Sequence, residues 1–296
     1  QWGLSMAEEN DNLKKGLYLI GIGPGDIGLL TNEAVEVAKH ATHRRYEAYT
    51  ASWPSEQLSL LQEKIGSIEK VMRPEVEKPQ ELLDLAQNDS VALLIVGDPL
   101  QATTHIDLQL QAEEKGIDCH VIHGISITNL VTGAIGLSNY KFGRQTTLTY
   151  PYSGWVATSP IETIAVNMFL GQHTLALLDL DPTGLGVGNQ IPMSPKSAAN
   201  SIISALQKLE EMVEDHPEDD EIALMKKAAF SALIERPLEE IAVVLCSDMG
   251  CKDQNITLTD IASLADLSGG RMNCLVFPGT TGDVEEKALL RWSKEE

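Results

Sequence analysis

Short apolar runs alternate with amphipathic stretches along the first half of the chain. The runs at 17–22, 91–96 and 119–123 are nearly continuous in apolar residues, as is typical of strands buried on both faces of a sheet. Further strands are predicted at 44–50 and 68–72, and helices at 31–41, 55–66, 79–88, 103–115 and 126–137. Strands that alternate with helices predict an α/β fold with a parallel or mostly parallel sheet.

A second set of elements follows the tract 138–145, which we interpret as the junction between two domains. Strands are predicted at 146–152, 173–180, 240–248 and 274–279, and helices at 160–170, on both sides of an acidic stretch, and at 258–265. We therefore expect an N-terminal α/β domain over 16–142 and a C-terminal α/β domain over 143–296. Residues 1–15 are expected to be a disordered tail or an expression remnant, with Met6 as the natural start.

The charge of the chain argues against nucleic-acid binding. Its 296 residues carry a formal net charge of −21, and an acidic surface repels phosphate backbones. Part of the excess lies in residues 210–221, which predict a solvated helix–loop–helix insertion at about 183–235; a saline cytoplasm is a second explanation.

Other classes of protein are disfavoured by what the sequence lacks. No apolar run approaches the length of a membrane span. The four cysteines form no C-x-x-C pair, so neither a disulfide framework nor a zinc site is expected. We expect a reducing, cytoplasmic location instead.

The first strand runs into a glycine-rich turn, GIGPGD at 21–26. A dinucleotide fingerprint, G-x-G-x-x-G, would need glycine where Asp26 stands, although Glu47 could imitate its ribose-binding acid. Pro24 cannot donate a hydrogen bond to a pyrophosphate, and Asp26 adds negative charge. S-adenosylmethionine, a sulfonium without phosphate, fits this turn better than NAD does. The alternative is a strand-to-helix turn without a ligand.

A second turn, GDPLQATTH at 97–105, follows the apolar strand 91–96. In open α/β sheets, ligands bind outside the carboxyl ends of the strands, which is where Asp98 is expected. Thr103 or Thr104 is expected to cap the next helix. The alternative for Asp98 is a turn residue that bonds its own backbone.

Together with these two turns, VIHGISITNLVTGAIGLSNYKFG (121–143) and HTLALLDLDP (173–182) resemble the diphthine synthase family, in its archaeal form, within the tetrapyrrole methylase superfamily. The resemblance implies a homodimer of two-domain chains with S-adenosylmethionine in a cleft between the domains. It implies methylation of the amino group of the 3-amino-3-carboxypropyl-histidine of elongation factor 2, up to trimethylation. S-adenosylhomocysteine would be the second product. A precorrin-type methyltransferase is the alternative within the fold, and a non-catalytic nucleotide-binding module is the alternative from another class.

The resemblance also assigns cofactor contacts and leaves the base open. The implied contacts are Pro24, Asp98, Gln101, Ser126, Ile127, Leu178, Met249 and Asn273. Pro24 stands where the family often has leucine, and Asn273 where it commonly has histidine. Candidates for accepting the amine proton are Glu47, Tyr49, His105, His123, Tyr140 and Lys141. Water could replace any of them, the two histidines could be structural, Tyr140 and Lys141 could brace the domain junction, and Glu47 could pair with Arg44 or Arg45.

Overall fold

The structure is a computed structural model that describes residues 13–152, 154–188 and 190–293. Most of the expected tail at 1–15 therefore lies outside the described residues. The chain forms two compact units that divide between Asn129 and Leu130, within helix α6 (Ile127–Ala134), and the short segments 185–190 and 250–252 belong to the first unit. This division comes earlier than the boundary expected at 142. None of the described helices is long and apolar enough to cross a membrane.

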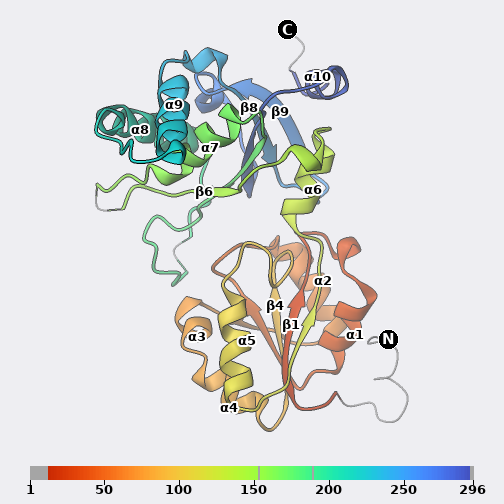
Figure 1. Ribbon diagram of the computed structural model, residues 1–296. Coiled ribbons are helices and arrows are strands. Elements are labelled where there is room, and N and C mark those ends of the chain that lie inside the picture. Colours follow the sequence, from red (N-terminus) through yellow and green to blue (C-terminus); the bar gives the residue numbers. More distant parts are fainter. Residues whose placement is uncertain (1–12, 153, 189, 294–296) are drawn as a thin grey trace. The chain divides into compact units, whose positions relative to one another are not determined.

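The first unit is built on a five-stranded sheet in which every pair of neighbouring strands is parallel (Figure 1). The strands are β1 (Gly16–Gly21), β2 (His43–Glu47), β3 (Glu69–Val71), β4 (Ser90–Ile95) and β5 (Cys119–Ile122), in the spatial order β3-β2-β4-β1-β5. The helices are α1 (Asn32–His40), α2 (Ser55–Ile65), α3 (Arg73–Glu77), α4 (Gln80–Ala86) and α5 (His105–Glu114), with a 3₁₀ turn η1 at Ile27–Leu29. The predicted order of elements in this half is confirmed, except that α3 was not predicted.

Helices cover both faces of this sheet. Leu17 and Leu19 of β1 pack in one cluster with residues of α4 and α5, whereas Tyr18 and Ile20 pack in another with residues of α1 and α2. Strand residues on both faces are thus removed from water, which explains why the central strands are apolar throughout.

Two helix starts differ in their side-chain hydrogen bonds. The Thr31 hydroxyl accepts a hydrogen bond from the Ala34 N–H at 3.1 Å and caps α1. At the start of α5, Thr104 occupies the cap position without a side-chain hydrogen bond, and Thr103 donates its hydroxyl to the Pro99 carbonyl. Of the two predicted caps, Thr104 therefore takes the cap position, without a capping hydrogen bond, and Thr103 does not, because its hydroxyl bonds to the preceding turn.

The second unit contains a mixed five-stranded sheet. Its strands are β6 (Thr146–Leu148), β7 (Thr174–Leu178), β8 (Ala242–Ser247), β9 (Asn255–Asp260) and β10 (Asn273–Phe277), in the order β6-β7-β10-β8-β9. Its helices are the C-terminal part of α6, α7 (Ser159–Phe169), α8 (Pro195–Val213), α9 (Glu221–Ile234) and α10 (Asp283–Leu290), with 3₁₀ turns η2 (Asn139–Lys141), η3 (Leu238–Glu240) and η4 (Leu264–Asp266). Only β6 and β7 are parallel among these neighbours, so the expected mostly parallel sheet is wrong here.

The segment 255–266 corrects the predicted helix at 258–265. It contains β9 followed by η4. Leu258, Ile261 and Leu264 recur every third residue, which is a helical spacing, but Thr257 and Thr259 alternate with apolar residues and are β-branched. Pairing along the whole of β8 decides in favour of the strand.

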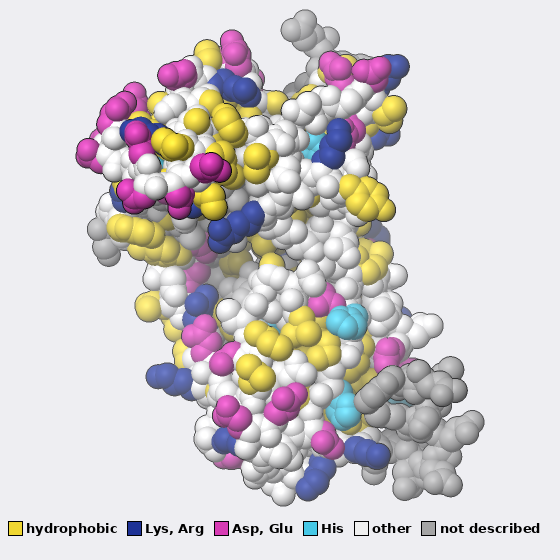
Figure 2. Space-filling model, viewed as in Figure 1, with side chains coloured by type: hydrophobic (Ala, Val, Ile, Leu, Met, Phe, Trp, Pro, Cys, Tyr) yellow, Lys and Arg dark blue, Asp and Glu magenta, His cyan; other side chains and the backbone are white. Residues whose placement is uncertain are grey.

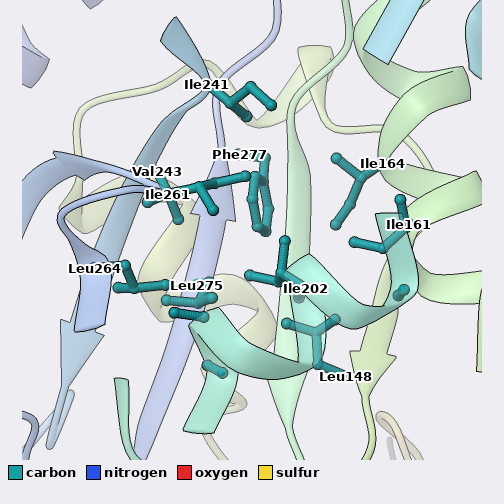
Figure 3. Close-up of a cluster of buried hydrophobic side chains, with 14 of the residues drawn as sticks. Leu148, Ile161, Ile164, Ile202, Ile241, Val243, Ile261, Leu264, Leu275 and Phe277 are labelled. Carbon is teal, nitrogen blue, oxygen red and sulfur yellow. The ribbon is translucent and has the colours of Figure 1, made fainter. Parts of the chain in front are cut away.

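The acidic stretch lies between two helices that form part of the core. In Figure 3, Ile202 of α8 lies among Leu148, Leu275 and Phe277, and Phe230 and Leu233 of α9 belong to the same cluster. Figure 2 shows acidic side chains gathered over the region where α8 and α9 lie in Figure 1. The two helices were predicted correctly, but the solvated insertion is wrong, because only the outer faces and the connection between them are acidic.

Candidate functional site

Three glycines bring the carboxyl ends of β1, β4 and β5 into direct backbone contact. A Cβ atom on Gly124 would lie 2.3 Å from the Gly97 carbonyl oxygen and 2.7 Å from the Gly21 carbonyl carbon. A Cβ on Gly21 would in turn lie 2.6 Å from the Gly124 nitrogen. No side chain fits at these distances, so the glycine after β5 and the glycine at the end of β1 are required by the close approach of the strands, whereas Gly97, the glycine after β4, is favoured by its φ of 78°.

The polar groups of the turn after β1 already have hydrogen-bond partners within the first unit. Gly23, at φ 73°, and Gly97, at φ 78°, exchange hydrogen bonds of 3.1 and 2.9 Å between their N–H and carbonyl groups. The Trp53 indole N–H donates to the Gly23 carbonyl at 2.9 Å. Asp26 accepts from the Gly28 N–H at 2.7 Å and caps η1. Since these N–H groups are already bound and Pro24 has none, the turn is a poor cradle for phosphate.

Asp98 links the ends of β4 and β5. Its Oδ1 accepts from the Leu100 N–H at 2.9 Å, and its Oδ2 accepts from the Gly124 N–H at 3.2 Å and from His123 Nδ1 at 2.8 Å. Asp98 is almost fully buried, whereas the His123 side chain is 75% exposed. Asp98 therefore bonds the backbone of its own turn and in addition fixes the end of the next strand.

The other candidates of the first unit lie beside this carboxylate. Gln101 is exposed, and its N–H donates to the Asp98 carbonyl at 3.3 Å. Ser126 is buried at the start of α6, where its hydroxyl accepts from Thr128 N and Oγ1 at 3.2 and 2.9 Å. Ile127 is partly buried next to it, as is Pro24 after β1. The structure thus gathers Pro24, Asp98, Gln101, Ser126 and Ile127 at one edge of the parallel sheet, where open α/β sheets bind ligands.

Glu47 and His105 form a buried pair near the ends of β2 and β4. They are 0% and 2% exposed, and Glu47 Oε2 lies 3.9 Å from His105 Nε2. Glu47 accepts from the Thr50 N–H and hydroxyl at 2.9 and 2.8 Å, while His105 Nδ1 lies 3.3 Å from the Pro99 carbonyl. Burial raises the pKa of Glu47 and lowers the pKa of His105. Glu47 is thereby inaccessible to a ribose.

The alternative partners of Glu47 are engaged elsewhere. Arg45 Nη1 lies 2.7 Å from Glu69 Oε2, and Arg44 donates to the carbonyls of Ala38 and Lys39. The suggested pairing of Glu47 with either arginine is therefore wrong, because both guanidinium groups project to other partners.

Tyr49 lies against an arginine that the sequence analysis missed. Tyr49 is buried, and burial, followed by the charge of Glu47, raises its pKa. The guanidinium carbon of Arg73 lies 5.2 Å from the centre of the Tyr49 ring. The position of Arg73 two residues beyond β3, at the same edge of the sheet as Asp98, was the signal that could have identified it.

The second unit gathers the remaining cofactor candidates at one edge of its sheet. Leu178 ends β7, Met249 follows β8, and Asn273 begins β10, which runs antiparallel to both. Leu178 and Met249 are buried. The Asn273 amide oxygen accepts from Ser247 Oγ and Gly270 N at 2.7 and 2.8 Å, and its nitrogen donates to the Met193 and Gly270 carbonyls. The asparagine therefore braces this edge with all four of its hydrogen-bonding positions.

Tyr140 and Lys141 lie at the opposite edge of that sheet. The Lys141 carbonyl accepts from the His173 N–H, directly before the first residue of β7. Lys141 Nζ lies 2.5 Å from Glu285 Oε2 of α10, and Tyr140 is 94% exposed. A five-residue strand separates them from Leu178 by about 15 Å. This geometry favours the bracing alternative for Lys141, whereas the exposure of the Tyr140 side chain gives that alternative no support.

Glu285 is the centre of this brace. Besides Lys141, it accepts from the N–H groups of Ser138 and Gly282 and from His173 Nε2, at 2.8, 3.0 and 3.3 Å. His173 Nδ1 accepts from the Gly279 N–H, so Nε2 carries the proton. Burial acts to raise the pKa of Glu285, but the donors, Lys141 first, lower it to about 2.

Replacing Glu285 by glutamine should lower the free energy of unfolding by about 2 kcal/mol at pH 7, because charge-assisted hydrogen bonds are lost. The pKa of Glu285 is lower in the folded protein than its ordinary 4.5, so its contribution is complete above pH 4.5 and disappears as the pH falls towards 2. Urea unfolding at several pH values measures this. The exposed neighbour Glu286, replaced in the same way, is the control, and a pH-independent difference would contradict the prediction.

Comparisons with known proteins agree with this fold. The protein-family model for tetrapyrrole (corrin/porphyrin) methylases matches residues 16–265, so the chain belongs to the tetrapyrrole methylase family. A diphthine synthase of Halorubrum lacusprofundi is 31% identical over 280 residues, which are 93% of this chain and 95% of that protein. Within the family, the chain accordingly belongs to the diphthine synthases.

Two further comparisons concern the length of the match and the fold. The diphthine synthase of Methanospirillum hungatei is 34% identical over 166 residues, which are 55% of this chain and 66% of that protein, slightly less than two thirds. A crystal structure of diphthine synthase superposes with a TM-score of 0.74 at 24% identity, covering 94% of this chain and 95% of that one. The likeness to this structure concerns the fold.

Proposed function

We propose that the protein is an S-adenosylmethionine-dependent methyltransferase of the diphthine type. It methylates the amino group of the 3-amino-3-carboxypropyl-histidine of elongation factor 2, up to the trimethylated product, in diphthamide biosynthesis. The observation that carries this proposal is the full-length similarity to a diphthine synthase. The edge of the parallel sheet supports it independently.

The first unit fits a cofactor without phosphate. The turns after β1 and β4 bond to each other through the N–H groups of Gly23 and Gly97, and Pro24 has no N–H group. A pyrophosphate would therefore find few donors there. The buried Asp98 carboxylate adds negative charge at the same edge, which suits a sulfonium cation. We assign Pro24, Asp98, Gln101, Ser126 and Ile127 to the cofactor, and on the resemblance alone also Leu178, Met249 and Asn273.

Little chemistry is then required of the side chains. The cofactor supplies an activated methyl group on a sulfur that is a good leaving group. The chain contributes by orienting the reactants and excluding water, which together can account for about 7–11 kcal/mol of barrier lowering. Glu47, Tyr49 and His105 remain candidates for helping the amine lose its proton. Because all three are buried, we favour water as the direct proton acceptor.

The two alternatives have less support. A precorrin-type methyltransferase would share the family and the GIGPGD turn, but the similarity that extends over the whole chain is to diphthine synthases. A non-catalytic nucleotide-binding module rested on Glu47 as a ribose ligand, and that carboxylate is fully buried and bonded to Thr50.

The deciding experiment incubates the protein with methyl-labelled S-adenosylmethionine and elongation factor 2 that carries the unmethylated intermediate. Label should appear on the modified histidine, and the peptide mass counts the methyl groups. A precorrin is offered in parallel as the competing acceptor. Label on the precorrin and none on the factor would overturn the proposal.

The proposed partners follow from the same family. Elongation factor 2 is the protein substrate, and a second copy of the chain is expected to complete a homodimer. Light scattering of the purified protein at several concentrations measures the molar mass, and a monomer throughout would contradict the dimer.

A further inference from the structure

The guanidinium of Arg73 lies at the same edge of the parallel sheet as the cofactor residues, and the proposed function does not use it. Its Nη1 lies 3.4 Å from Glu77 Oε1, in a pair whose two side chains are 38% and 50% exposed. Its Nε is buried and has no hydrogen-bond partner within the described part of the chain. A buried N–H without an acceptor costs about 1–3 kcal/mol, so a ligand oxygen brought to it would gain a strong, charge-assisted hydrogen bond.

The side chain of Arg73 is held in place from two sides. The Tyr49 ring lies on one side, with 5.2 Å between the guanidinium carbon and the ring centre. On the other side, the backbone N–H of Arg73 donates to the Gly186 carbonyl at 3.1 Å, and a Cβ on Gly186 would lie 2.7 Å from Arg73 Nε. Since Gly186 has φ 64°, both its backbone conformation and its lack of a side chain are needed for this contact.

The order of the strands separates this cation from the cofactor residues. Asp98 and the turns around it follow β4, β1 and β5, whereas Arg73 follows the edge strand β3. Two strand spacings lie between β3 and β4, which is about 10 Å. A molecule that reaches Arg73 therefore lies over the ends of β2 and β3, beside the cofactor residues and not among them.

We propose that Arg73 binds the carboxylate of the methyl acceptor and thereby selects an acceptor that ends in an amino acid. The inference rests on the proposed function, in which the acceptor carries an amine and a carboxylate on one carbon. A guanidinium presents Nε and Nη2 as a fork that matches two carboxylate oxygens, and aromatic stacking orients it beforehand. Because Nε is covered by the segment at Gly186, binding through both nitrogens requires this glycine-rich segment to shift.

S-adenosylmethionine also carries a carboxylate, so the test separates the two sources. Arg73→Gln should raise the KM for elongation factor 2 about 10- to 100-fold, and calorimetry should find the Kd for S-adenosylmethionine unchanged. Arg73→Lys keeps the charge without the fork and should restore only part of the loss. Lys70→Gln, an exposed lysine on the same edge strand, is the matched control and should change neither value.

Gly186→Ala provides a second probe that leaves the charge in place. Its methyl group would displace the Arg73 side chain, so it should raise the same KM, and thermal unfolding shows that each variant is folded. An unchanged acceptor KM in folded Arg73→Gln would overturn the inference, and so would a weaker Kd for S-adenosylmethionine with the acceptor KM intact. Failure of the wild-type protein to label elongation factor 2 would instead reject the proposed function.

Discussion

Replacement of Asp98 by alanine is expected to weaken the binding of S-adenosylmethionine about 100-fold. The carboxylate accepts hydrogen bonds from the Leu100 and Gly124 N–H groups and from His123, so its loss releases the turn after β4 and the end of β5 together. Leaving such donors without acceptors costs about 1–3 kcal/mol each, and a misplaced turn loses further contacts with the cofactor. Isothermal titration calorimetry measures the affinity.

Two controls separate binding from folding in this experiment. Asp107→Ala removes an exposed carboxylate from α5 and should leave the affinity unchanged. Thermal unfolding without cofactor shows whether the Asp98 variant is folded at the temperature of the titration. If the folded variant binds as tightly as the wild-type protein, Asp98 has no role in the cofactor site.

Gly124→Ala is expected to lower the free energy of unfolding by about 3 kcal/mol or more. The new methyl group would meet the Gly97 carbonyl oxygen at 2.3 Å and the Gly21 carbonyl carbon at 2.7 Å. Both are backbone atoms, which cannot rotate away as a side chain could. Overpacking of this kind typically costs 1–3 kcal/mol, and separation of three strand ends adds to it. Urea unfolding measures the change.

The chain offers a matched glycine for comparison. Gly133 lies in α6, and a Cβ there would meet no atom within 4 Å. Gly133→Ala should therefore be neutral or stabilise the protein by up to about 1 kcal/mol, because alanine favours the helix. Equal effects of the two substitutions would show that the contact among the three glycines is not tight.

The elements of the first unit were predictable because one physical signal dominates each of them. β1 and β4 are apolar on both faces, and α1 carries a threonine cap with apolar residues at helical spacing. α3 was missed because its five residues are too few to show a period. In the second unit, β9 was predicted as a helix, since apolar residues at every third position imitate one until pairing with β8 is known.

The candidate site was predictable in its positions and less so in its reasons. The GIGPGD turn was interpreted either as a ligand loop or as a turn without a ligand, and at Gly21 the structure shows that the missing side chain makes room for the backbone of a neighbouring strand. Glu47 was a candidate for binding a ribose, but its carboxylate is buried and accepts a hydrogen bond from Thr50. Arg73 was missed because its role depends on Tyr49 and Gly186, which are distant in the sequence. Contacts between distant residues are the part that a pattern along the chain does not contain.

The order of the strands has a consequence for synthesis on the ribosome. β1 pairs with β4 and β5, so the first sheet is complete once residue 122 has left the exit tunnel. In the second sheet, β10 lies in the middle although it is the last strand made, and both β7 and β8 depend on it. The first unit can thus fold early, while the second exposes unpaired strands until translation is almost finished. Nascent chains stalled before residue 273 should accordingly expose the second unit to chaperones and proteases.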